Sequence, residues 1–298
     1  MSGLATAERL REIGIDNVEV FEKDSTPGGL AKSFSWGGFE YNDLGPHIWH
    51  TPNQFLADEW KLRFGDLLFE NRFYGQNVIG ESPGRYFDYP LSNETLAQLP
   101  QELLKKVQIE LQSTTKEGLI KARSFDEYVE ALVGKSLKEM FFKSYPEKLW
   151  GIPTSLMTSN WAPKRIRFTE NSEEFHGSQW AAVGKKGSGA LINEIFSSAM
   201  SRGVKFRFGF HVSRIETENK KITALIDVNN ERVEIGPDDR VVSTIPFNFL
   251  SEQLGFDNSL SYRGALLVYV SINKDMALPG RASFLYFPQN DVNFHRLS

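Results

Sequence analysis

Glu22 closes a short stretch, Val18 to Glu22, in which apolar and acidic residues alternate as in a β-strand. Nineteen residues earlier, Gly3 stands at the start of a helical pattern that runs to Glu12 and stops at Gly14. A glycine that opens a helix and an acid at the end of the next strand can bind a dinucleotide, because the helix end donates to a diphosphate and the acid accepts from a ribose. An amphipathic helix followed by an ordinary strand that ends in glutamate explains the same residues, so both interpretations stay open.

Other residue patterns offer little catalysis of their own. The sequence has no cysteine, which excludes disulfides, thiolate catalysis, cysteine zinc sites and iron–sulfur clusters. Of five histidines, only His47 and His50 have a spacing seen in metal sites, and they follow Gly45 and Pro46, where a helix is not expected. No serine–histidine–acid set or carboxylate pair stands out. We therefore expect no metal, and chemistry that comes from a bound cofactor.

Four side chains allow two interpretations each. His47 could act at a cofactor or hold its loop by hydrogen bonds, and the second role is favoured because a cofactor does most of its own chemistry. Trp150 and Trp161 are expected in the core, since tryptophan is mostly buried. Arg165 fits a packed loop as well as it fits a cationic wall for a planar or phosphorylated substrate.

The overall charge limits the choice of partners. The chain has 34 basic and 38 acidic residues, a net charge of −4, and no basic run, which argues against a nucleic-acid surface. No apolar run is long enough to span a bilayer, and no signal peptide is visible. We expect a cytoplasmic protein that acts on a small-molecule substrate, with no nucleic-acid partner and no membrane span. Its oligomeric state stays open.

Strand-like and helix-like patterns alternate along the chain, which favours a mixed α/β architecture. The residues around Gly37 and Gly38 are typical of a hairpin. Region 51–142 is expected to be mostly helical, because 93–113 and 124–145 carry apolar residues at helical spacing. Ser124 and Glu127 resemble a capping box at the start of the second helix.

The later part of the chain predicts a helix followed by a sheet. Residues 190–202 have a helical pattern, and four short strand patterns follow at 204–209, 212–218, 222–228 and 231–236. The apolar stretches 239–245 and 265–272 each predict a buried strand.

Several segments resemble the flavin-dependent amine oxidase superfamily, and they occur in the order found there. They are "EKDSTPGGLAKSFSWGGFEYNDLGPHIWHT", "SYPEKLWGIPTSLMTSNWAPKRI", "AVGKKGSGALINEIFSSAMSRGVKFRFGFHVSRI" and "VVSTIP". The superfamily includes protoporphyrinogen oxidases, phytoene desaturases and UDP-galactopyranose mutases. The piece "GPHIWHT" is most similar to the mutase branch.

The resemblance implies an FAD site. Gly3 would be the third glycine of the phosphate loop, Glu22 would bind the adenosine ribose, and Gly28 and Gly29 would pass close to the diphosphate or the flavin. The other implied cofactor-binding residues are Lys32 beside a phosphate, Gly45 and Pro46 along the flavin ring, Val212 at the adenine, and Thr244 at the end of the returning strand. Many relatives have an arginine soon after the double glycine, where this chain has Leu30, Ala31 and Lys32. His47, at the flavin ring, and Arg165 are the implied catalytic residues.

The resemblance also implies the fold and the reaction. A Rossmann-like FAD-binding domain, residues 1–50 and 186–249, with its first strand missing, is expected to be interleaved with an α+β substrate domain, residues 51–185 and 250–298. The implied enzyme is an FAD-dependent oxidoreductase in which an organic substrate delivers a hydride to flavin N5. The alternative is a flavin-dependent isomerase of nucleotide sugars, similar to UDP-galactopyranose mutase, with Arg165 at the substrate diphosphate.

By the same comparison, both ends of the sequence are expected to be incomplete. The first strand and two earlier glycines are expected upstream of Met1, and a further segment after Ser298. A third possibility is therefore a non-catalytic fragment. We expect weak or absent FAD binding by residues 1–298 alone, because the main anion site and a central strand would be lost.

Overall fold

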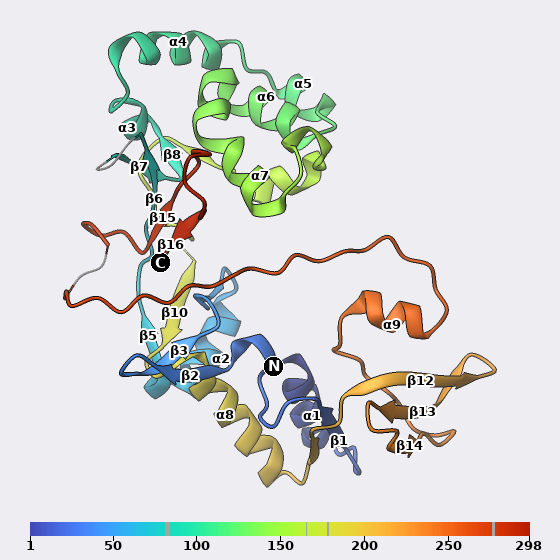
Figure 1. Ribbon diagram of the computed structural model, residues 1–298. Helices are drawn as coiled ribbons and strands as arrows, with labels where there is room; N and C mark the ends of the chain where they lie inside the picture. The colour runs from blue at the N-terminus through green and yellow to red at the C-terminus, as the bar shows by residue number, and fades with distance from the viewer. Residues whose placement is uncertain (81–83, 165, 178, 276–277) are drawn as a thin grey trace. The chain divides into compact units, whose positions relative to one another are not determined.

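The computed structural model describes residues 1–298 except 81–83, 165, 178 and 276–277 (Figure 1). The chain divides into two compact units, each built from three segments. Unit 1 comprises Met1–Ile48, Glu59–Phe69 and Val183–Val270, and unit 2 comprises Trp49–Asp58, Glu70–Ala182 and Ser271–Ser298. Their assignment as a cofactor domain and a substrate domain stays a prediction.

Unit 1 begins with the predicted helix and strand, α1 (Ser2–Glu12) and β1 (Glu19–Glu22), which confirms both. Gly14 has a φ of 84°, a left-handed conformation that lets the chain leave the helix. β1 pairs in parallel with β11 (Lys205–Phe208), so that Glu22 lies opposite Phe208.

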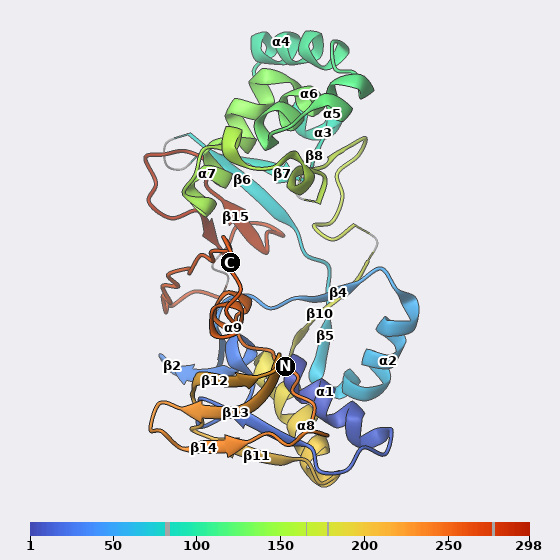
Figure 2. The same cartoon turned by 90° about the vertical axis from the view of Figure 1, so that its right-hand side faces the viewer.

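The helix that precedes β11 is α8 (Gly187–Ser201), which begins slightly earlier than the sequence predicts. It packs beside α1 (Figure 2), where Ala7, Ala199 and Val204 are buried together. α2 (Gln54–Phe64) contributes Arg63, which donates two hydrogen bonds of 2.8 Å to the buried carboxylate of Glu8 in α1. These contacts fix α1 on two sides.

The predicted hairpin is formed by β2 (Ser33–Trp36) and β3 (Phe39–Asp43). Gly37 and Gly38 have φ values of 62° and 83°, which a tight hairpin turn requires and glycine adopts at little cost. The short helix η1 (Gly29–Ala31) leads into β2.

Three of the four predicted strands form an antiparallel meander, whereas the first of the four, β11, pairs with β1 in another sheet. The strands of the meander are β12 (Val212–Glu218), β13 (Lys221–Asp227) and β14 (Arg232–Glu234). Phe210, Ile215 and Leu225 form its buried core, against which α9 (Phe247–Gln253) places Leu250.

Two strand predictions are wrong. Residues 239–245 and 265–272 form no strand in the structure. Val242, Leu266 and Val268 are exposed by 60%, 92% and 76% of their surface. Among the described residues no strand pairs with either segment, and an isolated strand leaves its main-chain groups without partners.

Unit 2 contains most of the helices, and region 93–113 forms two of them rather than one. They are α3 (Asn93–Leu96), α4 (Gln101–Gln112), α5 (Lys116–Lys121), α6 (Phe125–Leu137), the π-helical η3 (Lys138–Phe142), α7 (Ser144–Trp150), η4 (Thr154–Leu156) and η5 (Ser159–Lys164). Ser124 caps α6 by accepting from the Glu127 amide at 3.2 Å. The Glu127 carboxylate accepts from the Arg123 amide instead of from Ser124, so the reciprocal half of the expected capping box is absent.

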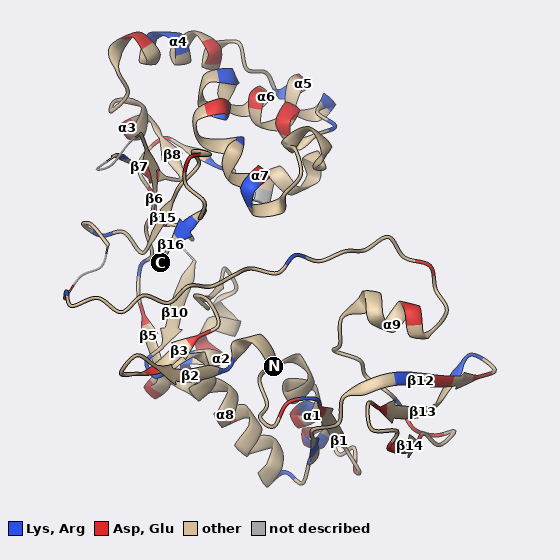
Figure 3. Ribbon diagram, in the orientation of Figure 1, with Lys and Arg blue, Asp and Glu red and all other residues tan. Residues whose placement is uncertain are grey.

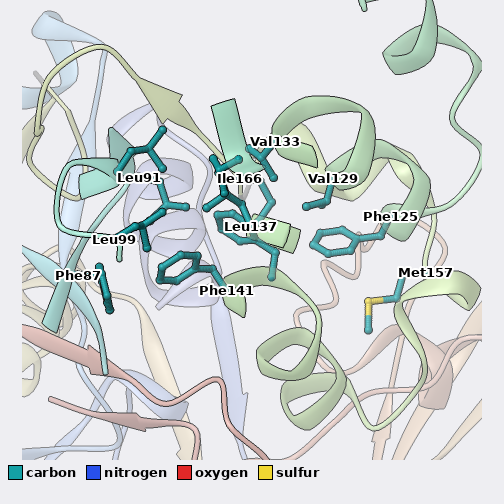
Figure 4. Packing of buried hydrophobic residues seen from close by; sticks show 14 residues of the cluster. Phe87, Leu91, Leu99, Phe125, Val129, Val133, Leu137, Phe141, Met157 and Ile166 are labelled. Carbon is teal, nitrogen blue, oxygen red and sulfur yellow. The ribbon is translucent and has the colours of Figure 1, made fainter. Parts of the chain in front are cut away.

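The helices of unit 2 enclose its main core (Figure 4). Phe125, Val129, Val133 and Leu137 line the buried side of α6 at helical spacing, and all four are fully buried. The outer surfaces carry both signs of charge (Figure 3), with ion pairs such as Lys105–Glu102 in α4 and Lys121–Glu117 in α5.

Region 51–142 is mostly helical, as predicted, and also contains short strands. A four-stranded sheet of unit 2 has the order β16 (Arg296–Leu297), β15 (Phe284–Tyr286), β6 (Gly75–Ile79), β7 (Arg85–Tyr89). β8 (Leu91–Ser92) pairs with β9 (Phe168–Thr169), and β4 (Trp49–Thr51) pairs with residues 180–182 of β10 (Trp180–Gly184). The remaining elements are η2 (Gly65–Leu67) and β5 (Leu68–Glu70).

The described helices are all too short or too polar to cross a membrane.

The core of unit 2 predicts a large stability difference between two similar substitutions. Leu137→Ala removes a fully buried side chain and should lower the free energy of unfolding by about 2–5 kcal/mol, through lost burial and a cavity. Ile120→Ala is the control, because Ile120 is 84% exposed and its change should stay within about 0.5 kcal/mol. Urea titration followed by circular dichroism measures both. Equal losses would contradict this placement of the core.

Candidate functional site

The carboxyl end of β1 and the amino end of α1 lie close together in unit 1. Glu22 is the last residue of β1 and is half-buried. Burial lowers the pKa of the Met1 α-amino group, and the Glu22 carboxylate opposes this shift, so the two charges are within electrostatic reach. Glu22 also accepts from the Asp24 amide at 2.9 Å, which orients its side chain.

The amino end of α1 presents unpaired main-chain donors. In the described part of the chain no side chain caps this helix, and its first turn contains no acid. Gly3 faces Thr244, and a Cβ atom placed on Gly3 would lie 3.4 Å from the Thr244 hydroxyl oxygen. The structure thus brings together Gly3 and Thr244, two residues far apart in the sequence that were both expected at the cofactor.

The double glycine forms a tight turn beside these elements. Gly28 and Gly29 have φ values of 119° and 58°, a region that other residues rarely adopt. Gly28 is buried, and a Cβ atom there would lie 3.0 Å from Ile192 of α8. Lys32 forms an ion pair with Asp24 across this turn, and that hydrogen bond lowers the pKa of Asp24. The charge of Lys32 is therefore matched within the protein.

The amino end of α8, in contrast, is occupied by protein groups. The Asp43 carboxylate accepts from the Ser188 amide, and the Ser33 hydroxyl accepts from the Gly189 amide. A carboxylate at this position satisfies the helix donors and compensates the helix dipole. Of these two helix ends, only that of α1 has no side-chain acceptor among the described residues.

His47 lies on the loop after β3 and points back to the glycine turn. Its Nε2–H donates to the main-chain oxygen of Leu30 at 2.8 Å. Gly45, with a φ of 88°, and Pro46 form the bend that places it there. This hydrogen bond is the contact that a positioning role for His47 requires.

Val212 begins β12, close to the end of β1. The Phe210 amide, two residues earlier, donates to the main-chain oxygen of Glu22 at 3.1 Å, and the Phe21 and Phe210 rings are 4.9 Å apart. Val212 therefore follows the strand end that carries Glu22.

In unit 2, Trp161 packs on the core residue Phe125, with ring centroids 5.2 Å apart, and it also contacts Trp150, with ring centroids 5.6 Å apart. These contacts agree with the core interpretation for Trp161, whereas Trp150 is 41% exposed. Arg165 lies outside the described residues.

One pair of histidines in unit 2 was not anticipated. His50 and His176 stack with ring centroids 4.0 Å apart, and His50 Nδ1 hydrogen-bonds the Gln179 side-chain oxygen at 3.1 Å. The Nε2 atom of His176 is buried without a hydrogen-bond partner. The spacing of His47 and His50 drew attention to His50, but its actual partner is distant in the sequence. No group of three metal-ligating side chains occurs among the residues that the structure describes.

A parallel strand pair, an uncapped helix end and a strand-terminal carboxylate are typical of the proteins that bind anionic nucleotides at a helix amino end. The chain belongs to the flavin containing amine oxidoreductase family, whose model matches residues 1–273. This is a family of flavin enzymes, and its match supports the resemblance seen in the sequence.

The chain is also similar to a curated protein and to solved structures. A probable UDP-galactopyranose mutase from Klebsiella pneumoniae is 27% identical over 182 residues, which are 59% of this chain and 45% of that protein. The chain thus spans less than half the length of this relative. A crystal structure of reduced UDP-galactopyranose mutase matches with a TM-score of 0.76 at 23% identity, over 98% of this chain and 66% of that one. A putative protoporphyrinogen oxidase from Exiguobacterium sp. 255-15 matches with a TM-score of 0.57 at 18% identity, over 85% of this chain and 59% of that one. Both structures establish a shared fold.

The histidine stack predicts a pH dependence of stability. Burial, together with the nearby charges of His50 and Arg167, lowers the pKa of His176 from 6.5 to about 4. As the pH falls below 6.5, the unfolded chain therefore binds a proton at this position before the folded chain does, and stability is lost toward pH 4. We expect the melting temperature to fall less between pH 7 and pH 5 in His176→Gln than in the parent protein.

The exposed His211 supplies the matched control, His211→Gln, which should keep the parental pH dependence. A parental slope in His176→Gln would contradict the assignment.

Proposed function

We propose that unit 1 binds FAD and that the protein is a flavin-dependent oxidoreductase. The observation that carries this proposal is the free amino end of α1 beside the carboxylate of Glu22, in a chain of a flavin enzyme family. The donors of α1 suit a diphosphate, and Glu22 suits the hydroxyls of the adenosine ribose. A site that binds only a phosphate would gain nothing from an adjacent carboxylate.

The other residues near this position fit the same ligand. Gly3 leaves room for close approach to the helix end, and Thr244 lies directly beside it. Lys32 neutralises Asp24, which reduces the repulsion that a second carboxylate would exert on a diphosphate. The main chain at Val212 would meet the adenine.

The turn at Gly28 and Gly29 and the loop of Gly45, Pro46 and His47 would line the flavin. In this proposal the hydrogen bond from His47 to Leu30 holds the loop and the turn together, so that the ring is oriented and water is excluded. Bound FAD supplies the capacity to accept a hydride at its N5 atom.

A nucleotide-sugar isomerase is the second candidate, because the curated relative with 27% identity is a probable UDP-galactopyranose mutase. In that reaction the protein would hold the sugar nucleotide diphosphate, for which Arg165 is the candidate. The isomerisation leaves no net change in oxidation state, which distinguishes it from the oxidoreductase.

Replacement of Glu22 tests the cofactor site. Glu22→Gln should weaken FAD binding about tenfold or more, because one hydrogen bond to a charged acceptor is lost. Flavin mononucleotide lacks the adenosine ribose, so its binding should not change. Quenching of flavin fluorescence, with titration to about 1 mM because weak binding is expected, measures both.

Glu19→Gln is the matched control, since Glu19 lies at the opposite end of the same strand. Equal effects of Glu22→Gln on the two flavins, or an equal effect of Glu19→Gln, would contradict the ribose assignment.

Turnover separates the two reactions. With FAD and an organic substrate, the oxidoreductase should consume one two-electron acceptor for each product molecule, as monitored by dye reduction. Conversion of UDP-galactopyranose by the reduced protein, without consumption of an acceptor, would overturn the oxidoreductase and favour the isomerase.

A further inference from the structure

The amino end of α8 is closed by two side chains from the hairpin β2–β3. Both carboxylate oxygens of Asp43 accept from the Ser188 amide, at 2.9 and 3.0 Å. The Ser33 hydroxyl accepts from the Gly189 amide at 2.8 Å and donates to Asp43. We call Ser33, Asp43 and the first turn of α8 the clamp.

The clamp leaves no space for another anion. A Cβ atom on Gly187 would lie 2.8 Å from the Asp43 carboxylate, and one on Gly189 would lie 2.7 Å from the Ser33 nitrogen. Ser188 itself is fully buried. The carboxylate therefore takes the place that a phosphate would otherwise occupy at this helix end.

The clamp also reaches the glycine turn. Ile192 follows the clamped turn of α8 and lies against Gly28, while Lys32 after η1 leads directly into Ser33. The Tyr269 hydroxyl donates a hydrogen bond to the main-chain oxygen of Asp43, and this bond restrains the end of β3. The position of the double glycine is thus coupled to the hydrogen bonds of Asp43.

We propose that Asp43 is a positioning residue that seals α8 against anions, holds the turn at Gly28, and so directs a dinucleotide diphosphate to α1. The claim that Asp43 directs a diphosphate to α1 rests on the proposed FAD function. Asp43 itself does not contact the cofactor in this proposal, and its influence passes through Ser33, Ser188 and Ile192.

The first experiment probes the clamp with inorganic phosphate, independently of FAD. In the parent protein, the amide resonances of Ser188 and Gly189 should not shift when phosphate is added. In Asp43→Ala the vacated helix end should bind phosphate, and both resonances should shift in a saturable manner. The Ser188 amide should also exchange with solvent about fivefold to tenfold faster in this variant.

Three further variants distinguish loss of the clamp from loss of folding and from a general loss of charge. Asp43→Asn retains an acceptor oxygen without the charge, so it should restore slow exchange even if Asp43→Ala folds poorly. Ser33→Ala should speed exchange at Gly189 more than at Ser188. Asp238→Asn removes a charge from an exposed loop and should behave like the parent. Phosphate shifts at Ser188 in the parent, or none in folded Asp43→Ala, would overturn the seal.

The second experiment measures FAD and flavin mononucleotide binding to the same variants. Asp43→Ala should weaken both ligands at least fivefold, because the displaced turn affects the flavin end as well as the diphosphate. Unchanged affinities would overturn the positioning role. Failure of the parent to bind either flavin would count against the FAD proposal, whereas the phosphate and exchange results would still decide the seal.

Discussion

The free main-chain donors at the amino end of a helix are the constraint on which unit 1 depends. Buried N–H groups without partners are costly, so each helix end needs a side chain, water or a ligand. Unit 1 meets this requirement differently at α8 and at α1. α8 is satisfied internally by Asp43 and Ser33, whereas α1 remains open next to Glu22. In the proposed site, an anion would therefore bind at α1 rather than at α8.

Unit 2 meets a comparable constraint with a buried cation. Lys138 is 5% exposed at the junction of α6 and η3, and its ammonium donates to Asp126 at 2.7 Å and to Glu130 at 2.6 Å. Burial alone would lower the pKa of Lys138, but the two carboxylates outweigh it and the pKa is raised. The lysine therefore stays charged. Loss of either acid would leave part of that charge unpaired, because buried ions are costly without partners.

Local sequence patterns correctly predicted the elements that form their hydrogen bonds within themselves or with a neighbouring segment of the chain. α1, the hairpin at Gly37 and Gly38, and the meander β12–β14 are confirmed, since each makes its hydrogen bonds to itself or to an adjacent strand. The segments 239–245 and 265–272 have the same apolar character but no strand to pair with in the described chain. A strand-like pattern indicates only that a segment can join a sheet. The strand forms only where a neighbouring strand is available to pair with it.

The same distinction applies to the candidate site. Glu22 was predicted from its spacing to Gly3, whereas Gly28 and Gly29 were predicted from the resemblance to the amine oxidase superfamily, and the roles of all three stay predictions. The clamp of Ser33 and Asp43 on α8, and the stack of His50 on His176, join residues more than a hundred positions apart. No sequence motif around these serine, aspartate and histidine residues identifies such a distant partner. Only the packing of the hairpin on α8, and of β4 on β10, brings these groups together.

Charge balance explains why the open end of α1 suits a dinucleotide better than a simple phosphate. Glu22 lies near this end, within electrostatic reach of the Met1 α-amino group, whereas Asp24 is paired with Lys32. An anion placed directly beside Glu22 would meet its carboxylate, and the repulsion is strong at short range in a partly buried site. A ribose hydroxyl between the carboxylate and the diphosphate removes this conflict, because it donates to the acid and sets the phosphates farther away along the helix end. In the proposed complex, Glu22 therefore selects for the nucleoside as well as binding it.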